Sequence, residues 1–214
     1  VTVTILGTNH AVVITSGPQT ADAFELADTT GSTAIDTTTT TPSGTLAFTD
    51  ADTGDTHSVE VTLTTTSWSA GGSAPSGTEV DLAAAVTTAL TDSTGTGNGI
   101  IDWTFAIQDQ DLDFLAAGET LTASYDVAIN DGSTTSHQTV SVTVTGANDA
   151  VVMTGGPQSG SVEERADTTG SSEPDSTSPD PTGTLAFSDV DLSDTHTVSV
   201  SVNSATWSAN PEFV

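Results

Sequence analysis

One stretch of this 214-residue chain occurs twice. Residues 44–57, Gly-Thr-Leu-Ala-Phe-Thr-Asp-Ala-Asp-Thr-Gly-Asp-Thr-His, return as Gly-Thr-Leu-Ala-Phe-Ser-Asp-Val-Asp-Leu-Ser-Asp-Thr-His in residues 183–196. The separation, 183 − 44 = 139 residues, holds without a gap between residues 7–68 and residues 146–207. A repeat of this length is the size of a whole domain, so the sequence predicts tandem copies of one domain.

The repeat predicts three parts. Residues 1–10 hold an alternating run, Val-Thr-Val-Thr-Ile, which indicates the half-buried closing strand and linker of a preceding repeat. Residues 11–149 form a complete β-sandwich repeat, and residues 150–214 match only the first half of the next one. A half sandwich exposes an apolar face and strand edges. We therefore expect a partner to cover it, through a homodimer, strand exchange with a neighbouring chain, or docking on the complete repeat.

Apolar residues alternate with polar ones over most of the complete repeat. Examples are Leu46 with Phe48, and Trp103 with Phe105, each pair on one face of a strand. The pattern predicts an all-β fold of six or seven antiparallel strands, an Ig-like or cadherin-like β-sandwich. The segment 79–90 has helical spacing and several alanines, so we expect one short helix per repeat there, with a strand as the alternative.

Charge limits the possible partners. The chain has 29 acidic residues against one basic residue, for a formal net charge of −28, and it has no cysteine. Such a surface cannot neutralise phosphates, so nucleic acid is excluded, and insertion into an anionic membrane is disfavoured. Without thiols, disulfides and thiolate metal sites are also excluded. Mutual repulsion of the carboxylates must be offset by salt or bound cations.

The doubled stretch carries three carboxylates within six residues. Asp50, Asp52 and Asp55 follow a predicted strand, and their spacing suits Ca²⁺, which takes six to eight oxygen ligands from a loop. The alternative is a solvated polar turn. The second copy of these carboxylates, and the lack of basic residues to balance their charge, favour a metal site over a polar turn. The further candidate ligands are Asp189, Asp191, Asp194, Glu25, Glu164, Asn148, Asp149, Asp109 and Asp111.

Two of these positions carry qualifications. Asp109-x-Asp111-x-Asp113 begins like an EF-hand loop but lacks the Gly and Glu that such a loop requires, which leaves a different calcium loop or a core-anchored turn. The position of Asp149 is occupied one repeat earlier by His10. Because imidazole is a poor calcium ligand, we expect the first joint between repeats to bind metal weakly or not at all.

Catalysis is not expected. No nucleophile elbow is present, four scattered histidines do not suggest a zinc site, and His57 and His196 are expected to hydrogen-bond nearby carboxylates. Trp68, Trp103 and Trp207 are placed in the core, because they lie in alternating strands.

Together, several motifs resemble a known family. They are the doubled Gly-Thr-Leu stretch, Leu-Asp-Phe-Leu-Ala-Ala-Gly-Glu-Thr-Leu from residue 112, Asn-Asp-Gly at residue 130, and Val-Thr-Val-Thr-Gly-x-Asn-Asp-Ala near residue 142. In this order they closely resemble VCBS, or bacterial cadherin-like, repeats of large RTX-type adhesins. The resemblance covers essentially the whole chain. It implies tandem Ig-like sandwiches, secretion to the bacterial surface, and Ca²⁺ near the joints, with Asp50, Asp52, Asp189, Asp191, Asn148 and Asp149 as ligands.

The function expected on this basis is a calcium-stabilised extender module of a secreted adhesin, one that stiffens the array and projects an adhesive tip for cell adhesion or biofilm formation. Two alternatives remain. The first is a module that binds glycan or peptide through the segment near Glu79 or the loop near Trp68. The second is an acidic surface adapted to high salt without specific metal sites.

Overall fold

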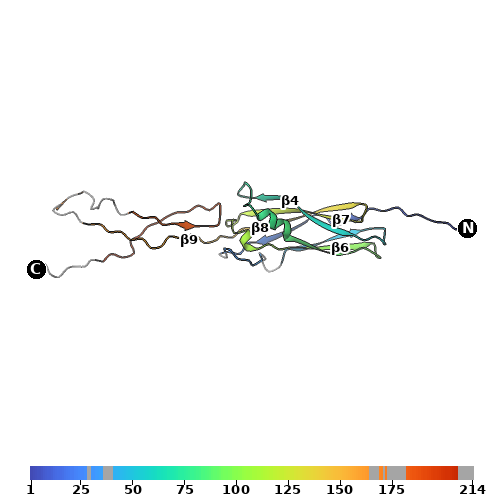
Figure 1. Ribbon diagram of the computed structural model, residues 1–214, viewed down its shortest axis with the longest axis horizontal. Coiled ribbons are helices and arrows are strands. Elements are labelled where there is room, and N and C mark those ends of the chain that lie inside the picture. The colour runs from blue at the N-terminus through green and yellow to red at the C-terminus, as the bar shows by residue number, and fades with distance from the viewer. Residues whose placement is uncertain (28–29, 36–40, 164–168, 171, 173–181, 207–214) are drawn as a thin grey trace.

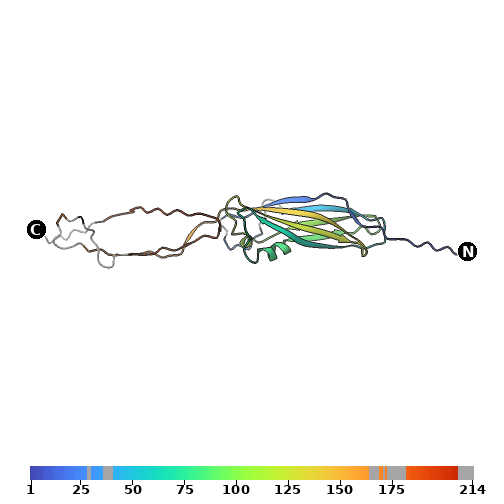
Figure 2. The ribbon, with the colours of Figure 1, turned by 90° about the horizontal axis from the view of Figure 1, so that it is seen from above.

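The computed structural model describes residues 1–27, 30–35, 41–163, 169–170, 172 and 182–206. The molecule is elongated, with one β-sandwich formed by residues 11–149, hereafter the sandwich (Figure 1). Residues 1–10 extend from one end of it. The described residues of the range 150–206, hereafter the C-terminal segment, extend from the opposite end, and Figure 2 shows the same arrangement from a second direction. The predicted all-β class is confirmed.

Two four-stranded sheets make up the sandwich. The first has the order β1-β3-β6-β5 and consists of β1 (Val13–Ile14), β3 (Ser43–Thr49), β6 (Asn98–Phe105) and β5 (Val86–Thr91). The second has the order β2-β8-β7-β4 and consists of β2 (Gln19–Phe24), β8 (Thr135–Thr145), β7 (Thr120–Asn130) and β4 (Ser58–Trp68).

One strand pair departs from the antiparallel arrangement that the sequence predicts. β2 runs parallel to β8, from Gln19 opposite Val140 to Phe24 opposite Thr145. The chain passes from β1 in one sheet to β2 in the other through four residues. One of these is Pro18, which has no backbone N–H to donate to a neighbouring strand. Ser16 joins the sheets at this crossing, because its Oγ accepts from Ala47 N over 2.8 Å and its carbonyl accepts from Gln138 Nε2 over 2.7 Å.

Side chains that alternate along each strand fill the space between the sheets. In β7 every second residue is buried, and β6 shows the same pattern. Trp103, Tyr125, Phe48 and Phe105 are the largest fully buried side chains. The predicted core faces are therefore confirmed. Trp68 is partly buried and packs against this core, while Trp207 lies outside the described residues.

The segment 79–90 contains both of the structures considered for it. The helix α1 spans Thr78–Ala85, and β5 follows directly from Val86. The alanines suit the helix, while Val86 begins a run with β-branched threonines that suits a strand. Leu82 anchors the helix in the core, where its carbonyl accepts a hydrogen bond from Tyr125 Oη over 2.8 Å.

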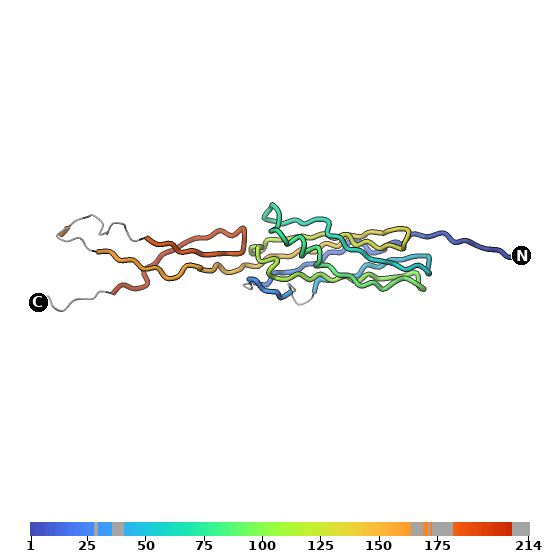
Figure 3. Tube along the Cα trace, viewed as in Figure 1, coloured from blue at the N-terminus to red at the C-terminus, as the bar shows by residue number. Residues whose placement is uncertain are grey.

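The assignment of residues 1–10 to the closing strand and linker of a preceding repeat stays a prediction, because the strands that it would join would belong to that repeat. Residues 1–10 form no strand and are exposed, since no other described strand lies beside them (Figure 3). In the C-terminal segment, β9 (Val152–Met153) pairs with β10 (Phe187–Ser188). Its apolar side chains remain exposed, with Val198 at 84%, Val200 at 93% and Val202 at 85%. The described residues therefore do not pack this face on the sandwich.

Candidate metal centre

The parallel pairing of β2 and β8 brings both strand ends to the pole of the sandwich from which the C-terminal segment leaves. Glu25 follows β2 directly, and its backbone N–H donates to Thr145 O over 3.0 Å. Its Oε2 accepts from Ala147 N, two residues beyond the end of β8, over 2.8 Å. These contacts hold the carboxylate of Glu25 at the point where the chain leaves the sandwich.

Three acidic side chains converge at this pole. Glu25, Asp113 and Asp149 each offer a carboxylate oxygen, and these oxygens lie within 4.8 Å of one another. Glu25 is 6% exposed and Asp149 is 3% exposed. Asp113 comes from the turn after the short 3-10 helix η1 (Asp109–Asp111), while Asp149 lies in the connection to the C-terminal segment. The cluster therefore joins three separate parts of the chain.

A fourth carboxylate, from the C-terminal segment, bonds the backbone of one member of this cluster. Asp191 Oδ2 accepts the backbone N–H of Asp149 over 2.9 Å, and Asp191 is 3% exposed. Its other oxygen, Oδ1, is buried without a hydrogen-bond partner in the described part of the chain. Burial raises the pKa of Asp191 to about 6, and repulsion from the nearby Asp189, Asp194 and Asp149 adds to the effect.

Backbone donors from the turn after β2 position the acidic residues of the 109–113 segment. Leu26 N donates to Asp109 Oδ1 over 3.1 Å, and Gly31 N donates to Asp113 Oδ2 over 2.7 Å. The second oxygen of Asp113, Oδ1, is buried and makes no hydrogen bond to the described residues. Burial raises the pKa of Asp113, and the carboxylate of Asp149 contributes in the same direction. A cation bound here would offset both the burial of the Asp113 carboxylate and its repulsion from Asp149.

The two copies of the doubled stretch make the same contacts. We refer to residues 50–57 as the first acidic loop and to residues 189–196 as the second. His57 Nε2 lies 3.0 Å from Asp50 Oδ2, and His196 Nε2 lies 2.8 Å from the corresponding oxygen of Asp189. Each histidine ring packs on a phenylalanine two residues before the loop, at centroid distances of 5.2 and 5.0 Å. The expectation that these histidines bond carboxylates is confirmed.

The first acidic loop also brings its three carboxylates together. Oxygens of Asp50, Asp52 and Asp55 lie within 4.8 Å of one another. Two of the three already have internal donors, however. Asp50 Oδ1 accepts Asp52 N over 2.7 Å, and Asp52 Oδ2 accepts the backbone N–H of His10 over 2.5 Å. The ring of His10 lies 3.2 Å from Asp52 Oδ1, so an imidazole occupies the place that a carboxylate holds at the other pole.

The remaining sequence candidates lie around these groups. Asn148 directs its side-chain N–H to Asp149 O over 2.6 Å. The backbone N–H of Asp194 donates to Asp191 O over 3.2 Å, which closes the second loop. Asp111 faces Asp81, and burial followed by repulsion from that carboxylate raises its pKa. Glu164 lies outside the described residues.

Sequence reasoning missed two acidic residues. Asp113 was not among the candidate ligands, although it completes the Asp-x-Asp-x-Asp series whose first two members were. Asp92 was also missed. Its Oδ1 lies 2.7 Å from His57 Nδ1, so the buried ring of His57 contacts a carboxylate at each nitrogen. No local motif marks Asp92, because the contact spans 35 residues.

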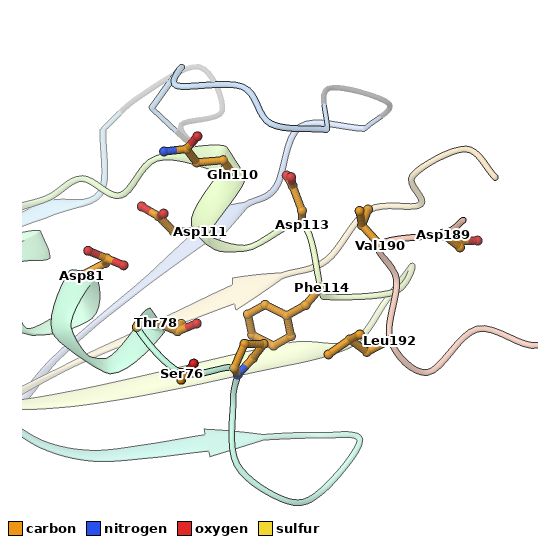
Figure 4. A pocket seen from close by; sticks show the side chains of 12 residues that line it. Ser76, Thr78, Asp81, Gln110, Asp111, Asp113, Phe114, Asp189, Val190 and Leu192 are labelled. Atoms are coloured by element: carbon orange, nitrogen blue, oxygen red, sulfur yellow. The ribbon is translucent and has the colours of Figure 1, made fainter. Parts of the chain in front are cut away.

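An open pocket of about 490 Å³ lies between the sandwich and the second acidic loop (Figure 4). Asp81, Asp111, Asp113 and Asp189 contribute acidic groups to its lining. Phe114 and Leu192 form part of its apolar wall and lie beside each other in Figure 4. The pocket at the joint is therefore lined by both acidic and apolar groups.

Comparisons with known proteins leave the family open. No known protein family matches the sequence, and no curated protein matches it. Among solved structures, AggA, the major subunit of aggregative adherence fimbriae type I from Escherichia coli, aligns with a TM-score of 0.29 and 12% identity. The alignment covers 66% of this chain and 99% of that one. A TM-score this low carries no argument about function. Of the helices in the described ranges, none has the length and hydrophobicity to cross a lipid bilayer.

Proposed function

We propose that this chain is a calcium-stabilised extender module of a secreted bacterial surface adhesin, built from tandem Ig-like, cadherin-like units. The observation that carries the proposal is the cluster of Glu25, Asp113 and Asp149 at the joint, with Asp191 joined to it from the following segment. The 139-residue sequence repeat and the resemblance to bacterial cadherin-like repeats support the tandem arrangement and the extracellular location.

The donor set suits a hard cation. All four side chains are carboxylates, the chain has no thiol, and no histidine belongs to the cluster. Calcium prefers such oxygen ligands, whereas zinc and copper favour nitrogen or sulfur. The buried Oδ1 atoms of Asp113 and Asp191, which lack hydrogen-bond partners among the described residues, are available to an ion. Carboxylates this close repel one another until a cation is bound.

Calcium would act here because its binding is thermodynamically linked to the alignment of the joint. The ligands come from the sandwich, the connection and the C-terminal segment, so they converge only when these parts are aligned. An ion that binds only the aligned state stabilises it by about 2.7 kcal/mol when its concentration is a hundredfold above Kd. Extracellular modules bind calcium with Kd values of about 10⁻⁴–10⁻³ M, so the site would fill outside the cell. The bound ion would then stiffen the joint.

The test compares the chain with calcium and with EDTA. We expect calcium to raise the melting temperature and to increase the maximum dimension in X-ray scattering, since an aligned joint extends the molecule. Asp113→Asn should weaken both responses. Asp126→Asn serves as the matched control, because Asp126 is paired with His137 on the surface of the sandwich, away from the cluster. Identical melting and scattering with calcium and EDTA would rule out the proposal.

A further inference from the structure

The second acidic loop touches the sandwich at a place that involves none of the clustered carboxylates. Leu192 N donates to Phe114 O over 3.2 Å, and Ser193 Oγ donates to Glu119 Oε1. Figure 4 shows Leu192 beside Phe114 at the edge of the pocket. The C-terminal segment therefore meets the sandwich in three ways: through the covalent connection after Asp149, through the adjacent hydrogen bond from Asp149 N–H to Asp191, and through the tip of this loop.

Contacts within the sandwich itself hold the receiving surface in place. Glu119 Oε2 accepts Trp68 Nε1 over 3.0 Å and Ala116 N over 3.2 Å. These two donors orient the carboxylate so that Oε1 remains for Ser193. The ring of Trp68 meets that of Phe114 edge-on, at 5.1 Å between centroids and 86° between planes. A preorganised acceptor loses little side-chain entropy when its donor binds.

We propose that Trp68, Phe114 and Glu119 form a docking socket for the acidic loop of the following repeat unit, and that the socket recognises a hydroxyl donor at the position of Ser193. This inference rests on the proposed tandem arrangement. It adds a contact that needs no metal. A single covalent connection leaves the angle between two units free to vary, and a second contact away from that connection restricts it.

The first acidic loop indicates how the socket would discriminate between units. Thr53 and Gly54 occupy the positions of Leu192 and Ser193. A backbone N–H at position 53 could still reach a carbonyl like that of Phe114, but Gly54 offers no hydroxyl to a glutamate like Glu119. A unit with serine at this position should therefore be held at a more fixed angle than a unit with glycine.

The absence of cysteine allows a direct measurement of the angle. Cysteines introduced at Thr62 on the sandwich and Ser199 on the C-terminal segment, both exposed positions, can carry spin labels for a pulsed-dipolar distance measurement in EDTA. We expect a narrow distance peak for the parent sequence and a clearly broader peak in Ser193→Gly. Ser193→Thr keeps a hydroxyl and should retain the peak, as should Ser201→Gly, an exposed serine on the same segment.

Melting temperatures measured on the same samples verify that the sandwich is folded in each variant. A distance distribution in Ser193→Gly equal to that of the parent in EDTA would overturn the socket. Repeating the series with calcium separates this result from the metal proposal. If calcium changes nothing while Ser193→Gly still broadens the peak, the metal site fails and the socket stands. If calcium sharpens every variant equally and Ser193→Gly has no effect in EDTA, the socket alone fails.

Discussion

The backbone N–H of Asp149 donates to Asp191 Oδ2 across 2.9 Å, a hydrogen bond that brings two buried acidic residues from either side of the joint into contact. His10 and Asp52, 139 residues earlier, make the same bond over 2.5 Å. At that earlier position an imidazole replaces the carboxylate of Asp149. Changing His10→Asp should therefore increase repulsion around the first acidic loop and raise the amount of calcium bound. Equilibrium dialysis against labelled calcium would measure the change, and an unaltered stoichiometry and affinity would contradict it.

The buried ring of His57 predicts a pH dependence of stability. Burial alone would lower the pKa of His57, but hydrogen bonds to Asp92 and Asp50 outweigh it and raise the pKa above its ordinary value. A raised pKa in the folded state contributes stability that is complete below the unfolded pKa of about 6.5 and is lost as the pH rises through the folded pKa. The melting temperature should therefore fall as the pH rises above about 6.5 and through the raised pKa of His57.

Replacement of His57 isolates this contribution. His57→Gln should be less stable than the parent near pH 6 and should lose most of the decline toward pH 9, because the titrating group is gone. His137→Gln is the matched control, since His137 is exposed and pairs with one carboxylate only. Thermal melts monitored by circular dichroism at several pH values provide the measurement. Parallel pH curves for His57→Gln and the parent would show that the ring contributes nothing.

Close packing at a glycine in β6 predicts a strong effect of one methyl group. A Cβ on Gly99 would lie 2.1 Å from Phe48 Cζ, a ring that is 1% exposed. Gly99→Ala should therefore displace Phe48 and destabilise the sandwich by about 1–3 kcal/mol, the usual cost of overpacking a core. Gly54→Ala is the control, because a Cβ there meets nothing within 4 Å. Urea denaturation that gives equal midpoints for both variants would refute the argument.

The exposed apolar face of the C-terminal segment predicts association. Val198, Val200 and Val202 alternate along one stretch and are each more than four-fifths exposed, which favours pairing with a second chain. Sedimentation equilibrium should show a dimer whose population grows with protein concentration. Val200→Asp should shift the equilibrium toward monomer. Ser201→Asp is the control, because it adds the same charge at the neighbouring position without removing a valine of the exposed face. A monomer at all concentrations, with fast amide exchange across 182–206, would contradict the proposed partner.

The sequence was informative where its signals are local. Alternation predicted the buried faces that contain Phe48 and Trp103, and the histidine contact of the acidic loop was expected from its neighbours. The parallel pairing of β2 with β8 was not expected from the sequence. The crossing between the two sheets, at residues 15–18, produces no periodic pattern of apolar residues that could indicate it.

The acidic residues that meet at the joint are far apart in the sequence, which explains why Asp113 was missed there. Glu25 and Asp149 were both candidates, yet nothing in their spacing indicated that a third residue, Asp113, would meet them. Their proximity depends on the parallel strands, which place the end of β2 next to the connection after β8. Asp191 joins through a backbone hydrogen bond, and no side-chain pattern encodes such a bond.

Isothermal titration with calcium, after chelation and dialysis, tests the central claim most directly. The account predicts saturable binding with a Kd of about 10⁻⁴–10⁻³ M or tighter, weakened at least tenfold in Asp113→Asn and unchanged in Asp126→Asn. Sodium at the same ionic strength should not compete for the site. Heats that do not saturate, or that are the same for the parent and Asp113→Asn, would contradict a calcium centre at this joint.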